Sequence, residues 1–554
     1  MDLLRMTDPR PSISLEYIGF RKFFRALLPI AFSAALLAFA PPGHGAAFPF
    51  SRNEAARNDG QATPTKVVTA ALGSGFTTLD PYNATDKISR VVMKSFYEGF
   101  LRLNDRLEPE PSLALSAEPS EDGLSWVIKL REGVRFSNGE AFDAHAAKLN
   151  LDHLIHEKTR LGRSKMFGPI IAAEATGEYE ITLRLSEPFG FLRRRLAGGI
   201  LSMVCPAALS DPNWNLSNTP CGTGPYALKS YNPSELLEVV RRSDYWDGDL
   251  PHLAGIRFVP VVENHARAAM LKTGEADFAM PLPYESAPEI ERTPGLVVSR
   301  KPSTVMRFVA MNNLRAPYSD IRVREAINCA INREALVKAA YRGYARPASG
   351  VIPPAIPGAM LLGSWPYDPN KARALLAEAG FPDGFEANLW CAYQDSASQR
   401  AVQLIQQQLA AVGIRVKITI LEAGERVARV HKATPPGQVP ALELYYTGWS
   451  ASSDADWSLR PLYHSKSAPP VLFNTAYYTN ESVDSLMDQA FGIADETEAR
   501  AEQAKIQETI RKDAPYAWCI FEDSVAAWRS ELRGFTNQAD GGIDFIGATW
   551  DRQE

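Results

Sequence analysis

The feature that most constrains the fold is an alternation of short strand-like runs and amphipathic helical segments from about residue 66 onward. Residues 67–72 predict a strand, and residues 86–103 space apolar side chains at helical intervals. No internal repeat accompanies the alternation, which argues against a solenoid. A chain of 554 residues suffices for roughly three to four domain-sized units. We therefore predict an α/β or α+β protein built from several lobes.

Two helices can be placed more closely from the sequence. One runs from about Phe142 to Glu157, with Asp143 as its N-cap. The second is expected over the stretch IRVREAINCAINREALVKAA (321–340), as one helix.

The only long apolar run lies near the N-terminus. Arg21, Lys22 and Arg25 precede LLPIAFSAALLAFA (27–40), which small residues follow. This order is typical of a secretory signal peptide, because a membrane-spanning helix usually needs about 20 apolar residues. An uncleaved anchor helix is the alternative.

Small residues place cleavage of this leader after Gly45 or Ala47, and Met6 is a candidate for the true start. We take 1–46 as the signal peptide. Residues 47–65 are polar and without pattern, and we expect a disordered lead-in.

Export changes the meaning of the five cysteines. Cys205 and Cys221 flank a segment rich in Pro, Asn and Ser, and in an oxidising compartment they are candidates for a disulfide, worth roughly 3 kcal/mol. Cys329, Cys391 and Cys519 lie in apolar contexts, and we expect buried free thiols there. No CxxC pair occurs, which argues against a zinc ribbon and against a redox motif of the thioredoxin type.

The charge balance argues against a nucleic-acid partner. The formal net charge is −5, whereas nucleic-acid binding usually needs a basic face. The longest basic cluster is Arg193–Arg195, which we interpret as a solvated patch or a contact between lobes.

Enzyme motifs are sparse. No GxSxG, HExxH, GxxxxGK[ST] or GxGxxG occurs, and the glycines at 222 and 224 indicate a tight turn. His153 and His156 have a spacing that could hold a metal, but solvated helix residues are the simpler interpretation. Asp454 and Asp456 could form a hydrolase-like acid pair or could be turn and capping residues. We predict no catalysis, no metal site and no cofactor.

Four landmarks occur in order along the chain: LREGVRFSNGEAFDAHAAKLNL (130–151), GTGPYAL (222–228) followed by DYWDG (244–248), MNNLRAPYSDIRVREAINCAINREALV (311–337), and YDPNKARALLAEAGF (367–381). Together they resemble the solute-binding proteins of ABC importers, in the large bacterial family (family 5) that takes peptides and nickel. The resemblance covers about residues 66–550.

This resemblance implies a two-lobed periplasmic-binding-protein clamshell of α/β class with an extra inserted subdomain in lobe I. The implied parts are lobe I in 66–107 and 206–304, the inserted subdomain in 108–205, lobe II in 305–513, and a C-terminal return to lobe I in 514–554. It also implies a periplasmic monomer that delivers its ligand to a permease in the inner membrane.

Within the family, FTTLDPYNATDKISRVVMKSFYEGF (76–100), RAAMLKTGEADFAMPLPYE (267–285), GWSASSDADWSLRPLY (448–463) and SAPPVLFNTAYYTN (467–480) are most similar to the glutathione-binding branch. The implied ligand is glutathione or a related short peptide. Dipeptide-binding members place an Asp and an Arg where this chain has Ser452 and Ala392, which argues against ordinary dipeptides.

The candidate ligand-binding residues come from both lobes. They are Thr77, Thr78, Tyr82 and Tyr97 on lobe I, and Arg307, Trp390, Tyr393, Trp449, Ser452 and Asp454 on lobe II. Arg307 is a candidate fork for a carboxylate or else a surface arginine. Trp390 and Trp449 are cleft walls or core residues, and Asp454 is a candidate acceptor for an ammonium group.

Other functions remain open at this point. Within the class, the ligand could be another oligopeptide, haem or a nickel chelate. Outside it, the chain could be a secreted hydrolase that uses Asp454 and Asp456, or a signalling receptor without a transport partner.

Overall fold

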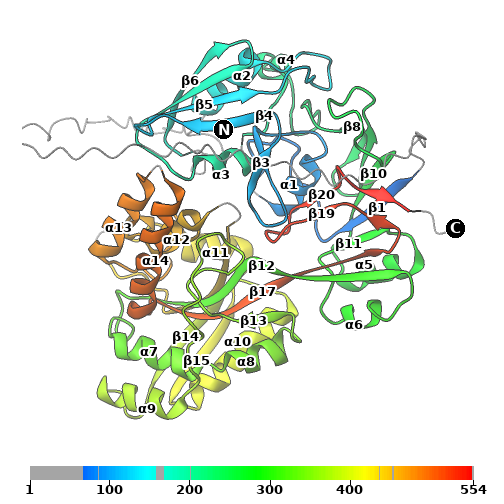
Figure 1. The fold of residues 1–554 in the computed structure, drawn as a ribbon. Helices are drawn as coiled ribbons and strands as arrows, with labels where there is room; N and C mark the ends of the chain where they lie inside the picture. The colour runs from blue at the N-terminus through cyan, green and yellow to red at the C-terminus, as the bar shows by residue number, and fades with distance from the viewer. Residues whose placement is uncertain are drawn as a thin grey trace, which may run out of the picture. The chain divides into compact units, whose positions relative to one another are not determined.

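The computed structural model describes most of the chain from Lys66 onward (Figure 1). The described ranges are 66–84, 86–156, 168–199, 201–435, 437–451, 454–493 and 495–551. They belong to one compact unit. The leader expected over 1–46 and the lead-in expected over 47–65 lie outside the described residues. Within the described ranges, no helix combines the length and the apolar character needed to cross a bilayer.

A mixed sheet of 11 strands organises this unit, in the order β15-β14-β16-β12-β17-β11-β1-β10-β9-β8, with β13 paired to β17. The strands are β1 (Val67–Leu72), β8 (Tyr226–Asn232), β9 (Leu236–Arg241), β10 (Gly255–Pro260), β11 (Phe278–Met280), β12 (Leu296–Met311), β13 (Ala345–Pro347), β14 (Phe385–Cys391), β15 (Ile414–Ile420), β16 (Leu444–Ser450) and β17 (Tyr516–Arg529). We call the half from β11 to β8, with the segments packed on it, lobe I. The half from β15 to β16 belongs to lobe II.

Two long antiparallel strands, β12 and β17, connect the two halves (Figure 1). β12 pairs with β17 along most of its 16 residues, and with β16 only at its lobe II end. The β12–β17 register shifts between Pro302 and Met306. Such irregularities interrupt the ladder and bend a strand locally. The lobe boundary expected between residues 304 and 305 therefore falls inside β12, at this irregular stretch.

In lobe II, the half of the sheet that belongs to this lobe carries a layer of helices on each face. Along β12, Met306 and Phe308 join one buried cluster, whereas Val309 and Met311 join another. This alternation is expected of a strand that is covered on both faces. The cluster of Val309 includes α7 (Ile321–Ala330), α9 (Pro369–Glu378) and α10 (Ser396–Ala410). The cluster of Met306 includes α11 (Ala423–Val430), α12 (Ala455–Tyr463), α13 (Glu481–Phe491) and α14 (Glu496–Asp513).

The single helix predicted over residues 321–340 is wrong. α7 ends at Ala330, and Ile331 is extended. Asn332 then caps a new start, where its side chain accepts a 2.9 Å hydrogen bond from the Ala335 backbone. The short α8 (Arg333–Ala335) and the π-helical turn η2 (Leu336–Ala340) follow. The local Asn332 cap therefore interrupts the segment and starts a new helical turn, where the prediction had one helix.

In lobe I the central sheet carries α1 (Lys87–Met93), α5 (Asn264–Thr273) and α6 (Ala287–Ile290). A separate four-stranded sheet consists of β4 (Ala114–Pro119), β5 (Ser125–Leu130), β7 (Glu180–Leu185) and β6 (Ile170–Gly177), in that order. α2 (Ala144–His156) contacts β6 and β7. It begins directly after Asp143, whose side chain accepts a 2.8 Å hydrogen bond from the Ala146 backbone, as expected of the predicted N-cap. α3 (Leu192–Ala197) and α4 (Pro206–Ser210) follow.

Three two-stranded ladders complete lobe I. They pair β2 (Leu101–Leu103) with β3 (Pro109–Pro111), β18 (Leu532–Arg533) with β21 (Thr549–Trp550), and β19 (Thr536–Asn537) with β20 (Ile543–Asp544). The C-terminal residues Leu532, Ile543 and Phe545 belong to the same buried cluster as β1 and α1. The chain thus returns to lobe I after β17.

The cysteines divide as the sequence suggests. Cys205 and Cys221 form a disulfide at the start of α4, and Cys329, Cys391 and Cys519 are buried free thiols.

Candidate functional site

A cavity of about 420 Å³ lies where β12 and β17 pass between the lobes. Lobe I lines it with Lys87 of α1 and with the loop after β1, and lobe II lines it with Arg307 of β12 and Asp395. Glu522 and Asp523 of β17 complete the wall. The lining thus brings cations and carboxylates from both lobes around one space. A polar ligand with charges of both signs suits such a site.

Arg307 is held rigidly in this cavity. Its Nε atom donates a 2.6 Å hydrogen bond to Glu522, and its guanidinium carbon lies 3.9 Å from the centre of the Tyr393 ring. Burial is the largest single influence and opposes the charged form. The Glu522 carboxylate and the nearby phenols of Tyr393, Tyr341 and Tyr446 together outweigh it, so the pKa of Arg307 lies above its ordinary value. A guanidinium fixed by an aromatic ring and an acid is preorganised to bind a carboxylate with its remaining N–H groups.

Lys87 is one of two lobe I cations among the described residues that line the cavity. It is the first residue of α1, after the N-cap Asp86. Its ammonium group lies against Gly541, where an added Cβ would come within 1.8 Å of Nζ. Burial lowers the pKa of Lys87, and the nearby Asp540 carboxylate opposes that shift.

A third cation at the cavity, Arg267, has a structural role. It donates from Nε to the Pro281 carbonyl at 3.0 Å and from Nη1 to the Val261 carbonyl at 2.6 Å. Its Nη2 atom donates to the Asn264 side chain at 2.5 Å. Arg267 therefore ties the start of α5 to the loop after β11.

The threonine pair proposed on lobe I is engaged within its own turn. Thr77 is exposed, and its hydroxyl donates to Asp86. The Thr78 hydroxyl donates to Ser217 at 3.0 Å and accepts from the Asp80 backbone at 3.0 Å. These contacts shape the segment between β1 and α1. Neither threonine is among the described residues that line the cavity.

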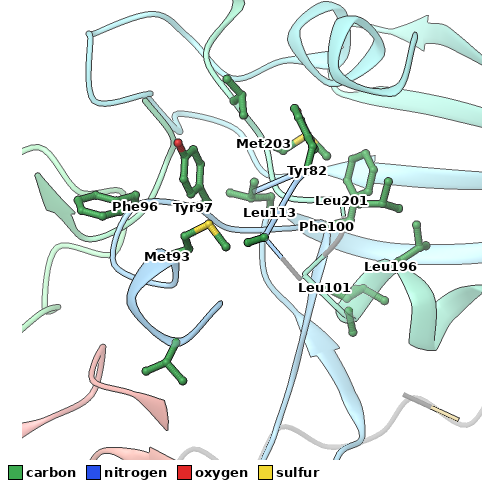
Figure 2. Packing of buried hydrophobic residues seen from close by; sticks show 14 of the residues in the cluster. Tyr82, Met93, Phe96, Tyr97, Phe100, Leu101, Leu113, Leu196, Leu201 and Met203 are labelled. Atoms are coloured by element: carbon green, nitrogen blue, oxygen red, sulfur yellow. The ribbon is translucent and has the colours of Figure 1, made fainter. Parts of the chain in front are cut away.

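The two lobe I tyrosines belong to the hydrophobic cluster of Figure 2. Tyr82 is 1% exposed, and its hydroxyl donates to Asn150 of α2. Tyr97 is 4% exposed and lies beside Gly222, where an added Cβ would come within 2.4 Å of its ring. Burial raises the pKa of both phenols. Tyr82 therefore packs lobe I against α2 of the inserted subdomain, and Tyr97 packs within lobe I beside Gly222.

The two candidate tryptophans of lobe II, Trp390 and Trp449, are half-buried against its core. The Trp449 ring lies 5.0 Å from the Phe473 ring, and its indole N–H donates to the Trp457 carbonyl at 3.3 Å. Trp390 lies at the end of β14, with the Arg429 guanidinium 5.8 Å from its ring centre. Each ring is therefore partly a core residue and partly accessible.

Asp454 begins α12. It is 1% exposed, and its carboxylate accepts a 2.7 Å hydrogen bond from the Trp457 backbone. The same carboxylate lies 2.8 Å from Nε of Arg195. Its charge is thus balanced within the protein. Ser452, the other candidate of this segment, lies outside the described residues.

Of the ten predicted site residues, Arg307 lines the cavity, and Tyr393, which is not among the described lining residues, contacts Arg307 directly. Sequence reasoning missed Lys87 and Glu522. A signal for Glu522 was present, because the charged pair Glu522–Asp523 interrupts an otherwise apolar strand. Within the described ranges, no group of three or more His, Cys, Asp or Glu side chains is arranged to hold a metal ion.

Comparison with known proteins agrees with this architecture. Residues 108–469 match the family described as bacterial extracellular solute-binding proteins, family 5 Middle. The glutathione-binding protein GsiB of Escherichia coli (strain K12) is 42% identical over 482 residues, which cover 87% of this chain and 94% of that protein. GsiB of Salmonella paratyphi A (strain ATCC 9150 / SARB42) is 42% identical over 486 residues, with the same coverage.

Solved structures show the same fold. The periplasmic binding protein DppA from Helicobacter pylori, in complex with the peptide STSA, superposes with a TM-score of 0.73 at 26% identity over 88% of this chain and 98% of that one. The substrate-binding protein CtaP from Listeria monocytogenes reaches 0.79 at 20% identity over 88% and 100%. The predicted two-lobed α/β fold is therefore confirmed. The chain belongs to family 5 of the bacterial extracellular solute-binding proteins, the substrate-binding components of ABC importers.

Proposed function

We propose that this protein captures glutathione, or a closely related short anionic peptide, between its lobes and delivers it to a membrane permease. The observation that carries the proposal is the preorganised Arg307, held by Glu522 and Tyr393 at a cavity that Lys87 lines from the other lobe. Similarity to proteins named for glutathione binding gives independent support.

The charges of the cavity fit the charges of this ligand. Glutathione carries two carboxylates and one ammonium group at neutral pH. Arg307 and Lys87 offer donors on opposite lobes, and Asp395 offers an acceptor. A ligand that contacts both lobes favours the arrangement in which the lobes are together. Binding and lobe closure are therefore coupled in this proposal.

The compartment follows from the same proposal. A periplasmic receptor requires export, for which residues 1–46 would serve as a cleaved signal peptide. The Cys205–Cys221 disulfide suits an oxidising compartment. We expect the mature protein to act as a monomer and to dock on the permease of an ABC importer.

Isothermal titration calorimetry on the mature protein tests the ligand. The panel contains glutathione, a neutral dipeptide, a longer oligopeptide, haem and a nickel–histidine chelate. We expect glutathione to bind and Arg307→Gln to weaken it by about tenfold to a hundredfold, because a charged hydrogen bond is worth roughly 1.5–3 kcal/mol. Arg415→Gln is the matched control, since Arg415 is an exposed lobe II arginine 3.9 Å from Glu386. Saturable binding of another panel member without glutathione binding would refute the proposal.

A further inference from the structure

Three consecutive arginines on α3 have different partners. Arg193 is partly exposed and pairs with Glu118 of the inserted sheet at 2.9 Å. Arg194 and Arg195 are buried instead, with 4% and 3% of their surfaces exposed. Both reach carboxylates of lobe II. From the sequence, this cluster was either a solvated patch or a contact between lobes. In the structure, one of its arginines is paired within lobe I and two lie at the interface with lobe II.

The arginines and carboxylates at the interface lie within ion-pair distance of one another. Arg195 Nε lies 2.8 Å from Asp454, and Arg195 Nη2 lies 3.6 Å from Asp456, both at the start of α12. Arg194 Nε lies 2.5 Å from Glu496, the first residue of α14. The side chains of Arg195 and Asp454 are 4% and 0% exposed, so this contact excludes water almost completely. Ion pairs in such surroundings are screened little by salt.

Aromatic rings surround the Arg195 guanidinium. It lies 5.5 Å from the centre of the Phe189 ring, on its own lobe, and 5.2 Å from that of Trp457 on α12. Phe189 in turn stacks on Phe491 of α13 at 4.5 Å. The inserted subdomain and lobe II thus meet in a packed contact of charges and rings, apart from the ligand cavity.

The lobe II side of this contact is held by lobe II itself. Arg460 lies 3.0 Å from Asp456 and 2.6 Å from Asp488. Burial raises the pKa of Asp456, and the Arg460 charge opposes that shift. Asp454 is fixed as the cap of α12. Lobe II contacts that do not involve Arg195 therefore position both carboxylates.

We infer that Arg195 is a positioning residue for ligand capture: its ion pairs with Asp454 and Asp456 fasten the inserted subdomain to lobe II and thereby set ligand affinity without contact to the ligand. Arg195 is not among the described residues that line the cavity. Its pairs exist only while the lobes are together, so they shift the equilibrium toward the closed arrangement. Apparent affinity scales with the fraction of molecules in the competent arrangement.

The inference rests on the proposed capture between lobes, but its first test needs no ligand. Small-angle X-ray scattering gives the radius of gyration of the ligand-free mature protein and of Arg195→Gln, Arg195→Lys and Arg193→Gln. We expect a larger radius for Arg195→Gln and an intermediate one for Arg195→Lys, which keeps the charge but not the fork. Arg193→Gln, the neighbour paired within lobe I, should match the wild type.

Calorimetry with glutathione supplies the second readout, for which we expect about tenfold weaker binding by Arg195→Gln and no change for Arg193→Gln. An unchanged ligand-free radius for Arg195→Gln would overturn the inference, whether or not affinity fell. If glutathione does not bind the wild type, the proposed function fails while the ligand-free radii still decide the role of Arg195. Should Arg195→Gln not fold, Arg195→Lys carries the same two comparisons.

Discussion

The Arg307 Nε atom donates a 2.6 Å hydrogen bond to Glu522, and these two residues lie on β12 and β17, the two strands that pass between the lobes. Arg307, the candidate ligand-binding residue with the most constrained geometry, is thus anchored on the two strands that connect the lobes. A ligand carboxylate that binds Arg307 would therefore contact a strand that connects the two lobes.

Tyr393 is expected to contribute to ligand affinity through Arg307. Tyr393→Leu removes the ring under the guanidinium, which is worth roughly 0.5–2 kcal/mol. We expect affinity for glutathione to fall by about threefold to thirtyfold in calorimetry. Tyr393→Phe keeps the ring and should bind like the wild type. Equal affinities for the Leu and Phe variants would show that the ring does not hold Arg307 for the ligand.

The disulfide is expected to support stability without affecting ligand affinity. Cys205 and Cys221 are 16 residues apart in sequence, and neither lines the cavity between the lobes. Replacing both with Ala should lower the free energy of unfolding by about 3 kcal/mol in the chain-entropy model. Guanidinium unfolding monitored by tryptophan fluorescence measures this loss, and calorimetry on the folded variant should return the wild-type affinity. An unchanged unfolding midpoint would contradict the prediction.

Glu98 is expected to make stability depend on pH. Burial raises its carboxyl pKa above the ordinary 4.5, against hydrogen bonds from Tyr245 at 2.7 Å and Trp246 at 3.0 Å. The folded protein therefore binds this proton more tightly than the unfolded chain does. The stability linked to that proton is fully present below about pH 4.5 and is lost as the pH rises through the folded-state pKa.

Urea unfolding at pH 5 and pH 7 measures this effect. The wild type should gain stability relative to Glu98→Gln at the lower pH, because the variant lacks the titrating group. Parallel stability curves for the two proteins would contradict the assignment.

Substitutions at two glycines of lobe II are expected to distinguish the cost of backbone strain from the cost of a steric clash. Gly380 and Gly384 have φ angles of 92° and 76°, which side chains disfavour. A Cβ at Gly380 meets nothing within 4 Å, whereas one at Gly384 would lie 2.0 Å from the Gly413 carbonyl oxygen. We expect Gly380→Ala to cost about 1–2 kcal/mol of unfolding free energy and Gly384→Ala clearly more. Thermal unfolding of the two variants side by side is the check, and equal losses would refute the steric part.

Local signals in the sequence sufficed for much of the fold. The predicted strand Val67–Leu72 is β1, and Asp143 accepts a hydrogen bond at the start of α2 as predicted. The error at residues 321–340 arose because the Asn332 cap competes locally with a helical period that the rest of the segment keeps. Periodicity alone does not register such a competition.

The site could be predicted only in part, because its geometry depends on contacts far apart in sequence. Arg307 and Glu522 are separated by 215 residues and meet only through the register of β12 and β17. Arg195 and Asp454 are 259 residues apart. A capping role for Asp454 was considered from its local sequence, but its partner on α3 depends on how two lobes meet. Composition and spacing do not determine such pairings.

The central position of β17 also has a consequence for how the chain can mature. It pairs with β12, β11 and β13, yet it comes from residues 516–529 of 554. A polypeptide that emerges from a ribosome or an export channel in N-to-C order cannot complete its main sheet until nearly the whole chain is out. Long-range pairing of this kind delays folding. The strand order therefore keeps the main sheet of a growing or translocating chain incomplete until β17 has emerged.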